Sequence, residues 1–293
     1  MEPGKIVFYE QPELYKPNLV AAFIGWPDAA QVSTGAVAYF INKLHAKKLA
    51  EMKSDDYYDF ATIRPTITVE NGIMTPMHLP MNTLYYWKDE EGGNDLILLT
   101  GIEPQMHWQS YVETIADVAG FFDTNRIYAV GGLYDRIPHT RETRISGLVN
   151  DENLLPELDQ HKIEPISYRG PSSIHGLLLS VCSTRRIPAI SMWGHVPFYI
   201  RSESNPMVCL EIVRKISAIL DIQVNLMELT KSAEYLQDVL NKLLSENEQM
   251  RNFLNALEQQ YDNEGSALGE EIMGADQIIQ DIEDFLRNQR QDF

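Results

Sequence analysis

The residues best suited to chemistry are two arginines, a glutamate and a histidine, namely Arg64, Glu103, His139 and Arg141. His139 and Arg141 lie just beyond a predicted strand that ends at Gly131–Gly132, and ligands of open α/β sheets bind at strand ends. The four could therefore line one cleft, where the arginines hold an anion and the acid or the imidazole transfers a proton. The competing interpretation is structural: Arg64 and Glu103 form ion pairs, and His139 is a loop residue.

Four further positions could add to this candidate ligand cleft. Thr140 stands beside His139, and Gly170 shortly precedes Ser172 and Ser173, which come directly before an apolar helix. Hydroxyls at that place usually cap the helix, because its first amide groups lack partners. The alternative is an anion held by the same amides. Both interpretations place the two serines at a helix N-terminus.

Familiar signatures of cofactor, metal and nucleophile sites are missing from the sequence. Neither phosphate-binding glycine motif occurs, and Trp26 and Pro27 stand where a dinucleotide loop needs close backbone approach. The seven histidines include no pair four residues apart, and Gly-x-Ser-x-Gly is absent. Cys182 and Cys209 lie on apolar stretches, so we expect buried thiols. The sequence thus predicts no cofactor and no metal, and favours an enzyme less than a binding protein.

The charge balance excludes whole classes of partner. The 293 residues hold 42 Asp and Glu against 24 Lys and Arg, a net charge of −18 at pH 7. Nucleic acids and anionic membrane surfaces are bound by an excess of Lys and Arg, so we expect neither as a partner. Two cysteines cannot form a disulfide framework, and we find no membrane span and no signal peptide. These features predict a soluble cytoplasmic protein.

The elements that must position the candidate residues alternate between strands and helices over residues 1–225. Predicted strands cover residues 19–24, 48–52, 95–100, 126–130 and 189–193, and predicted helices cover residues 28–44, 108–122, 174–184 and 206–220. Asp28 can cap the first helix. Asn71–Gly72 indicates a hairpin between two apolar segments, which residues 83–87 could extend, and it suggests a mixed sheet. We therefore expect an α/β body whose sheet is mixed, mainly parallel and flanked by helices.

Residues 226–293 differ from this body and form a predicted acidic helical appendage. They hold 15 acidic and 5 basic residues, a net charge of −10, against −8 for residues 1–225. Apolar residues recur there every seven positions, in the two offset rows of a heptad repeat. The candidate partner or oligomer surface on this stripe comprises Leu236, Leu243, Asn247, Met250, Leu254 and Leu257.

Two arrangements of the appendage follow from the same stripe. A hairpin within the chain would turn at residues 263–266 and return through a helix that includes Ile272, Ile279 and Ile282. A coiled coil between chains would use the same apolar rows, and Asn247 would then fix the register of the two helices. In the other case, Asn247 would lie at a hydrated edge.

A succession of short motifs resembles one protein family. In order, the motifs are Gly25-Trp26-Pro27-Asp28-Ala29, Asp59-Phe60 with Arg64-Pro65, Gly101-Ile102-Glu103-Pro104, Gly131-Gly132, Pro138-His139-Thr140-Arg141, Tyr168-Arg169-Gly170-Pro171-Ser172, Gly176-Leu177-Leu178 and Trp193-Gly194-His195-Val196-Pro197-Phe198-Tyr199. Their order and spacing over residues 18–260 resemble the bacterial and archaeal branch of the proteasome assembly chaperone 2 family.

The resemblance implies a three-layer, phosphorylase-like α/β body followed by helices. Its eukaryotic members pair with a partner and help to assemble proteasome α-rings. Together with the acidic appendage, it favours a non-catalytic, assembly-chaperone-like protein that binds a protein partner or self-associates as a homo-oligomer. Such charge favours a basic partner and makes the association sensitive to salt. The alternative is an enzyme that acts on a small anionic or nucleoside-like metabolite in the strand-end cleft.

Overall fold

One mixed sheet forms the frame of the molecule, for which a computed structural model describes residues 5–53, 56–75, 77, 79–264 and 275–290. Within these residues, nine strands join in the order β1-β3-β6-β7-β2-β8-β11-β9-β10. The central strands run parallel: β7 (Leu96–Ile102), β2 (Asn18–Ile24), β8 (Arg126–Asp135) and β11 (Ala189–Pro197). Antiparallel pairing adds β6 (Asn82–Trp87), β3 (Lys47–Met52) and β1 (Ile6–Phe8) on one side, and β9 (Ile145–Val149) on the other, where β10 (Glu164–Pro165) follows in parallel.

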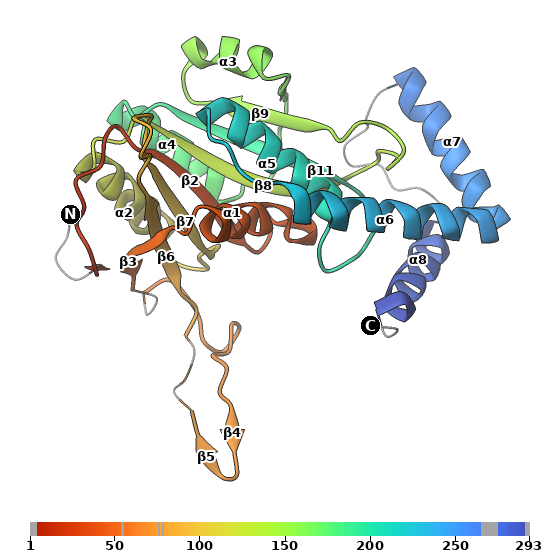
Figure 1. Cartoon of the computed structure of the whole chain (residues 1–293), viewed down its shortest axis with the longest axis horizontal. Helices are drawn as coiled ribbons and strands as arrows, with labels where there is room; N and C mark the ends of the chain where they lie inside the picture. The colour runs from red at the N-terminus through yellow and green to blue at the C-terminus, as the bar shows by residue number, and fades with distance from the viewer. Residues whose placement is uncertain (1–4, 54–55, 76, 78, 265–274, 291–293) are drawn as a thin grey trace.

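Helices cover both faces of this sheet (Figure 1). One face carries α2 (Trp108–Phe121) and α4 (Ile174–Arg185), and the other carries α1 (Val32–Lys43), α3 (Leu155–Gln160) and α5 (Pro206–Leu220). The central strands are buried on both sides, and this explains why their sequences read as apolar runs rather than as alternating patterns. The predicted α/β class, with a mixed sheet flanked by helices, is confirmed.

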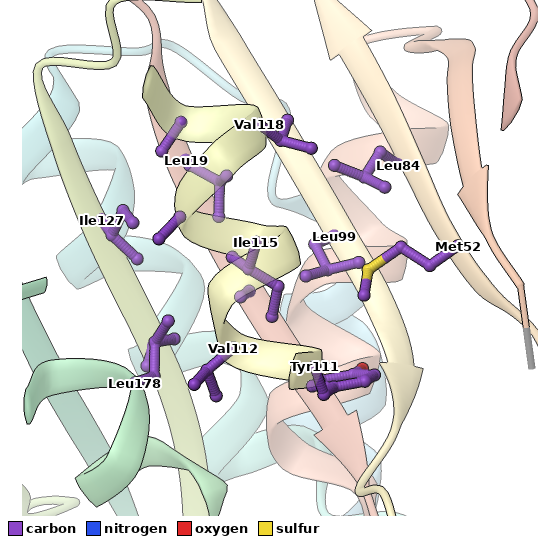
Figure 2. Close-up of a cluster of buried hydrophobic side chains, with 14 of the residues drawn as sticks. Leu19, Met52, Leu84, Leu99, Tyr111, Val112, Ile115, Val118, Ile127 and Leu178 are labelled. Atoms are coloured by element: carbon purple, nitrogen blue, oxygen red, sulfur yellow. The ribbon is translucent and has the colours of Figure 1, made fainter. Parts of the chain in front are cut away.

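The packing of α2 shows how the helix pattern builds the core (Figure 2). Tyr111, Val112, Ile115 and Val118 recur at spacings of one, three and three residues and are all fully buried. Figure 2 shows them turned towards strand side chains and towards Leu178 of α4. Helix α1 begins at Val32, later than predicted, because residues 29–31 form a short 3-10 turn first. The Asp28 carboxylate nevertheless accepts hydrogen bonds from the Ser33 and Thr34 amides of its first turn, at 3.0 and 3.2 Å.

The predicted Asn71–Gly72 hairpin exists but does not belong to the main sheet. Its strands β4 (Val69–Glu70) and β5 (Ile73–Met74) pair with each other in a separate two-stranded sheet. The expectation that residues 83–87 extend the hairpin is wrong, because β6 pairs with β3 and β7 instead. The main sheet is mixed because of its outer strands and not because of this hairpin.

Two strands run further than their sequences predict. β8 continues through Gly131 and Gly132 to Asp135, and β11 continues beyond Trp193 to Pro197. The glycines do not end β8; they leave room for packing, because a Cβ on Gly131 would come within 2.7 Å of the Trp193 ring. The sequence patterns also give no prediction for β1, β9, β10 and α3.

Three helices follow the body: α6 (Met227–Glu246), α7 (Glu248–Glu264) and α8 (Ala275–Arg290). α6 packs along α5, and α7 and α8 extend from its far end (Figure 1). The turn predicted around Gly265 and Ser266, and Ile272 of the predicted returning helix, lie outside the described residues. Ile279 and Ile282 belong to α8 and pack in the same apolar cluster as α6 and α7. None of the described helices combines the length and the hydropathy that a membrane span needs.

Candidate functional site

A groove of about 1260 Å³ lies beside the loop that connects β8 to β9. This loop, residues 136–144, is called the strand-end loop below, because it starts at the carboxyl end of β8. It contributes His139, Thr140 and Arg141 to the groove wall, and α5, α6 and β10 form the rest together with Tyr261 of α7. Three of the predicted cleft residues therefore do lie at one concave surface.

Two cations that line this groove, Arg144 and Lys215, already have protein partners. Arg144 binds Glu164 of β10 at 2.6 Å and approaches the buried Asp135 carboxylate at 3.4 Å. Lys215 of α5 donates to the backbone oxygen of His161 at 2.9 Å. Because these cations already have protein partners, an anion that binds here would have to displace those partners.

Helix α7 holds the strand-end loop by its acidic side chains. Arg141 donates to both carboxylate oxygens of Asp262, at 3.0 and 2.7 Å, and Thr140 donates to Glu258. The hydrogen bond from Arg141 lowers the pKa of the Asp262 carboxyl. A two-pronged arginine–carboxylate contact fixes geometry as well as charge. The guanidinium that is predicted to hold a substrate anion is thus bound by α7 of the same chain.

His139 is buried and already engaged on one ring nitrogen. The Tyr199 hydroxyl oxygen lies 2.7 Å from the His139 amide nitrogen and 2.7 Å from its Nδ1. The hydroxyl oxygen accepts from the amide, and the tautomer of the ring sets which atom donates in the second hydrogen bond. Burial lowers the pKa of His139 to about 4. The ring of Tyr199 also packs edge-on against Phe253 of α7, which adds an apolar link between loop and helix.

Glu103 lies at another place along the strand ends, beside the start of α4. Its carboxylate accepts a hydrogen bond from the Ile174 amide at 2.8 Å, and burial raises the pKa of this carboxyl. Ser173 is the N-cap residue of α4, and its hydroxyl accepts from the His175 amide at 3.2 Å. The amides that a bound anion would use at this helix N-terminus are therefore taken by Glu103 and Ser173.

The remaining predicted cleft residues are dispersed. Ser172 lies next to Ser173 and bonds to its carbonyl oxygen at 2.9 Å, and Gly170 lies against the ring of Tyr168. Arg64 is exposed in the segment that leads to β4. The structure thus brings His139, Thr140 and Arg141 together at the strand-end loop, places Glu103 with Ser173 at α4, and leaves Arg64 apart from both groups.

The stripe predicted as a partner or oligomer surface lies inside the chain. Leu236, Leu243, Met250, Leu254 and Leu257 are all buried, in an apolar cluster that also contains Tyr199 and Ile200. Asn247 is partly exposed and ends α6, and its side-chain oxygen accepts from the Met250 amide at 3.1 Å, which caps α7. The surface that these helices can offer to a partner is therefore their outer side and not this stripe.

A second polar group, which the sequence did not reveal, links three strands. His195 places Nδ1 2.6 Å from the Asp135 carboxylate and Nε2 2.7 Å from the Ser146 hydroxyl. This is the connectivity of a Ser-His-Asp triad. All three side chains are at most 2% exposed, so no substrate can reach the serine. Burial is the largest single influence on the pKa of Asp135 and raises it, but the contacts with His195, the Arg136 amide and Arg144 together outweigh burial, so the pKa is lowered. The only hint of these contacts in the sequence is that Asp135, Ser146 and His195 are polar residues within otherwise apolar strands.

The described residues offer no alternative metal centre, because no three His, Cys, Asp or Glu side chains gather among them. Cys182 and Cys209 are both buried, and burial raises the pKa of each thiol to about 12. The expectation of buried thiols is confirmed.

Comparisons with known proteins agree with the motifs. A family model described as the PAC2 family matches residues 22–244. A PAC2 family protein from Streptomyces avermitilis is 32% identical, with a TM-score of 0.72 over 78% of this chain and 95% of the other. A proteasome-assembly chaperone homologue from Mycobacterium tuberculosis is 26% identical, with a TM-score of 0.74 over 81% and 99%. An archaeal proteasome activator from Pyrococcus furiosus, 23% identical with a TM-score of 0.65 over 81% and 97%, shares the fold. No curated protein matches the chain.

Proposed function

Because the chain belongs to the PAC2 family, we propose that it is a non-catalytic, assembly-chaperone-like protein of the cytoplasm. In this proposal, residues 1–225 form a body that holds the helical appendage of residues 226–293 in place. The appendage presents its outer, acidic side to a protein partner, and the chain also associates with copies of itself.

One observation supports this proposal most strongly: acidic side chains of α7 bind Thr140 and Arg141 of the strand-end loop. The bidentate contact between Arg141 and Asp262 and the bond from Thr140 to Glu258 use the side chains that an anionic substrate would need. His139 is held by Tyr199, and its lowered pKa of about 4 leaves it uncharged at neutral pH. Beside the groove, this end of the molecule also exposes the outer sides of α6 and α7.

On the outer side of α6, several charged side chains are exposed to solvent. Glu234, Asp238 and Glu246 are exposed on the same side of this helix as Lys231 and Lys242, whereas Leu236 and Leu243 are buried. Carboxylates on a surface of net negative charge attract basic partners, and they act mainly on the association rate and on specificity. The Mycobacterium tuberculosis relative, a proteasome-assembly chaperone homologue at 26% identity, supports a protein as the partner.

The test compares partner binding before and after α6 is neutralised. The tagged chain is used to isolate a stoichiometric protein from its own cells, and that protein is purified and titrated calorimetrically. The triple variant Glu234→Gln, Asp238→Asn, Glu246→Gln keeps the side-chain shapes but removes three charges. We expect its dissociation constant to rise about tenfold, which corresponds to about 1.4 kcal/mol. The wild-type affinity should also fall between 50 and 300 mM NaCl, because salt screens exposed charges.

A matched control neutralises three exposed acids elsewhere, in the variant Glu90→Gln, Glu91→Gln, Asp123→Asn. It removes the same net charge and should leave the affinity within twofold of wild type. Equal weakening by both triple variants would show that only total charge matters and would contradict a site on α6. Saturable binding of phosphate or a nucleoside in a thermal-shift assay, with no protein partner, would instead support the enzyme alternative.

A further inference from the structure

The β4–β5 hairpin projects far from the rest of the molecule (Figure 1). We call the described residues around this hairpin, namely residues 63–75, 77 and 79–81, the arm. Within the described residues, β4 and β5 pair only with each other. A lone two-stranded hairpin is marginally stable in water and needs a further strand or an apolar surface. No further strand from the described part of the chain pairs with the arm.

The arm is also unusually apolar for an exposed segment. Among the described residues, 18 large apolar or aromatic side chains are exposed, and seven of them lie on the arm. They are 39–73% exposed and comprise Ile67, Val69, Ile73, Met74, Met77, Leu79 and Met81. Exposed apolar side chains that gather on one segment are a feature of interaction sites.

The charge of the arm indicates what covers it. Residues 63–81 contain one arginine and one acid, Arg64 and Glu70, so the arm is neutral in a chain of net charge −18. Two copies of such a chain repel each other, and the repulsion is smallest where the approaching surfaces carry no net charge. A basic partner, in contrast, would gain nothing from a neutral arm. Charge thus favours a second copy here, and a basic protein at α6.

The arm also meets the geometric requirement of self-pairing. A twofold contact brings the same patch of both chains together, so both exposed sets are buried at once and no separate receiving surface is needed. Both strands are edge strands and can accept another strand by backbone hydrogen bonding. Met74, Met77 and Met81 supply flexible side chains that adapt to each other across such a contact.

We propose that the arm pairs with the arm of a second copy of this chain and thereby forms its oligomer interface. The proposal specifies the surface for the self-association that the proposed function includes. It can fail separately from partner binding, because changes on the arm leave α6 untouched.

The first test is the size of the particle in solution. Wild type should sediment as a dimer or larger oligomer at 50 µM, and raising NaCl from 50 to 500 mM should not dissociate it, because apolar contacts are not screened. Ile73 is 73% exposed, so Ile73→Lys should leave the fold intact while raising the dissociation constant of the oligomer at least tenfold. Leu155→Lys, at a 44% exposed position on α3, is the matched control and should behave as wild type.

The second test is a direct cross-link that does not depend on weakened association. Cys182 and Cys209 are both buried, so Ile73→Cys introduces the one exposed thiol of the chain. Mild oxidation should convert this variant into a disulfide-linked dimer, whereas Leu155→Cys should stay unlinked. A monomeric wild type, an Ile73→Lys oligomer as stable as wild type, or cross-linking no faster than in the Leu155 control would each overturn the proposal.

Discussion

Two buried histidines make the stability of this protein depend on pH. His139 lies under Tyr199, and His175 of α4 has its Nδ1 2.9 Å from the Ser191 hydroxyl. Burial lowers the pKa of His139 to about 4 and that of His175 to about 3, from an ordinary value of 6.5. Both rings are therefore neutral in the folded protein under conditions where the unfolded chain takes up protons.

The sign and the size of the effect follow from these values. A histidine whose pKa is lower in the folded state contributes its full stability above pH 6.5, and that stability is lost as the pH falls towards 4 or 3. At pH 5.5, one unit below the pKa in the unfolded chain, each histidine lowers the free energy of unfolding by about 1.3 kcal/mol relative to pH 7.5. Together they should lower the free energy of unfolding by about 2.6 kcal/mol over this range, if they titrate independently.

The measurement is urea unfolding at pH 7.5, 6.5 and 5.5, followed by circular dichroism. This range stays above the isoelectric point, which is about 4.7. His139→Asn and His175→Asn each keep an acceptor near the position of Nδ1 but cannot titrate. Each variant is expected to be less stable than wild type at pH 7.5, because the smaller side chain leaves a gap. Its loss of stability between pH 7.5 and 5.5 should nevertheless be smaller than that of wild type by about 1.3 kcal/mol.

The control is His107→Asn, at an exposed position with left-handed backbone that asparagine tolerates. It should show the same pH dependence as wild type. Comparing how the free energy of unfolding changes with pH in each protein removes the contribution of the carboxylates, because all the variants contain the same carboxylates. Parallel pH profiles for wild type and for the two buried-histidine variants would refute the assignment of neutral, desolvated rings.

Two further predictions concern packing and capping. Gly131→Ala should lower the free energy of unfolding by about 1–3 kcal/mol, because the new Cβ meets the Trp193 ring at 2.7 Å, whereas Gly120→Ala on α2, with open space around it, should stabilise by about 0.5–1 kcal/mol. Thermal unfolding of the pair checks this, and equal midpoints would contradict the packing argument. Asn247→Ala should remove the cap on the Met250 amide and cost about 1 kcal/mol. In Asn247→Ala, amide hydrogen exchange in the first turn of α7 should be faster than in wild type. Asn247→Asp, which keeps a capping oxygen, should exchange at the wild-type rate.

Local patterns predicted most of the elements that hold this fold together. The apolar runs at β2 and β7, the helical spacing of α2 and α5 and the Asp28 cap all follow from neighbouring residues, and the structure confirms them. The errors occur where a residue type has more than one use. The sequence predicts that a strand ends at Gly131, whereas in the structure this glycine makes room for Trp193. The Asn71–Gly72 turn does not show which sheet its strands join.

The sequence by itself determined the α/β class, the uneven negative charge and the family resemblance, because composition, periodicity and motif order need no contacts between distant residues. Only the tertiary structure decided which residues of the candidate cleft lie together and which groups they bind. Arg141 meets Asp262 across 121 positions of the chain, Glu103 meets Ile174 across 71, and His139 meets Tyr199 across 60. Such pairings depend on how α4 and α7 pack against the strand ends, and no local pattern encodes the packing of one element on another.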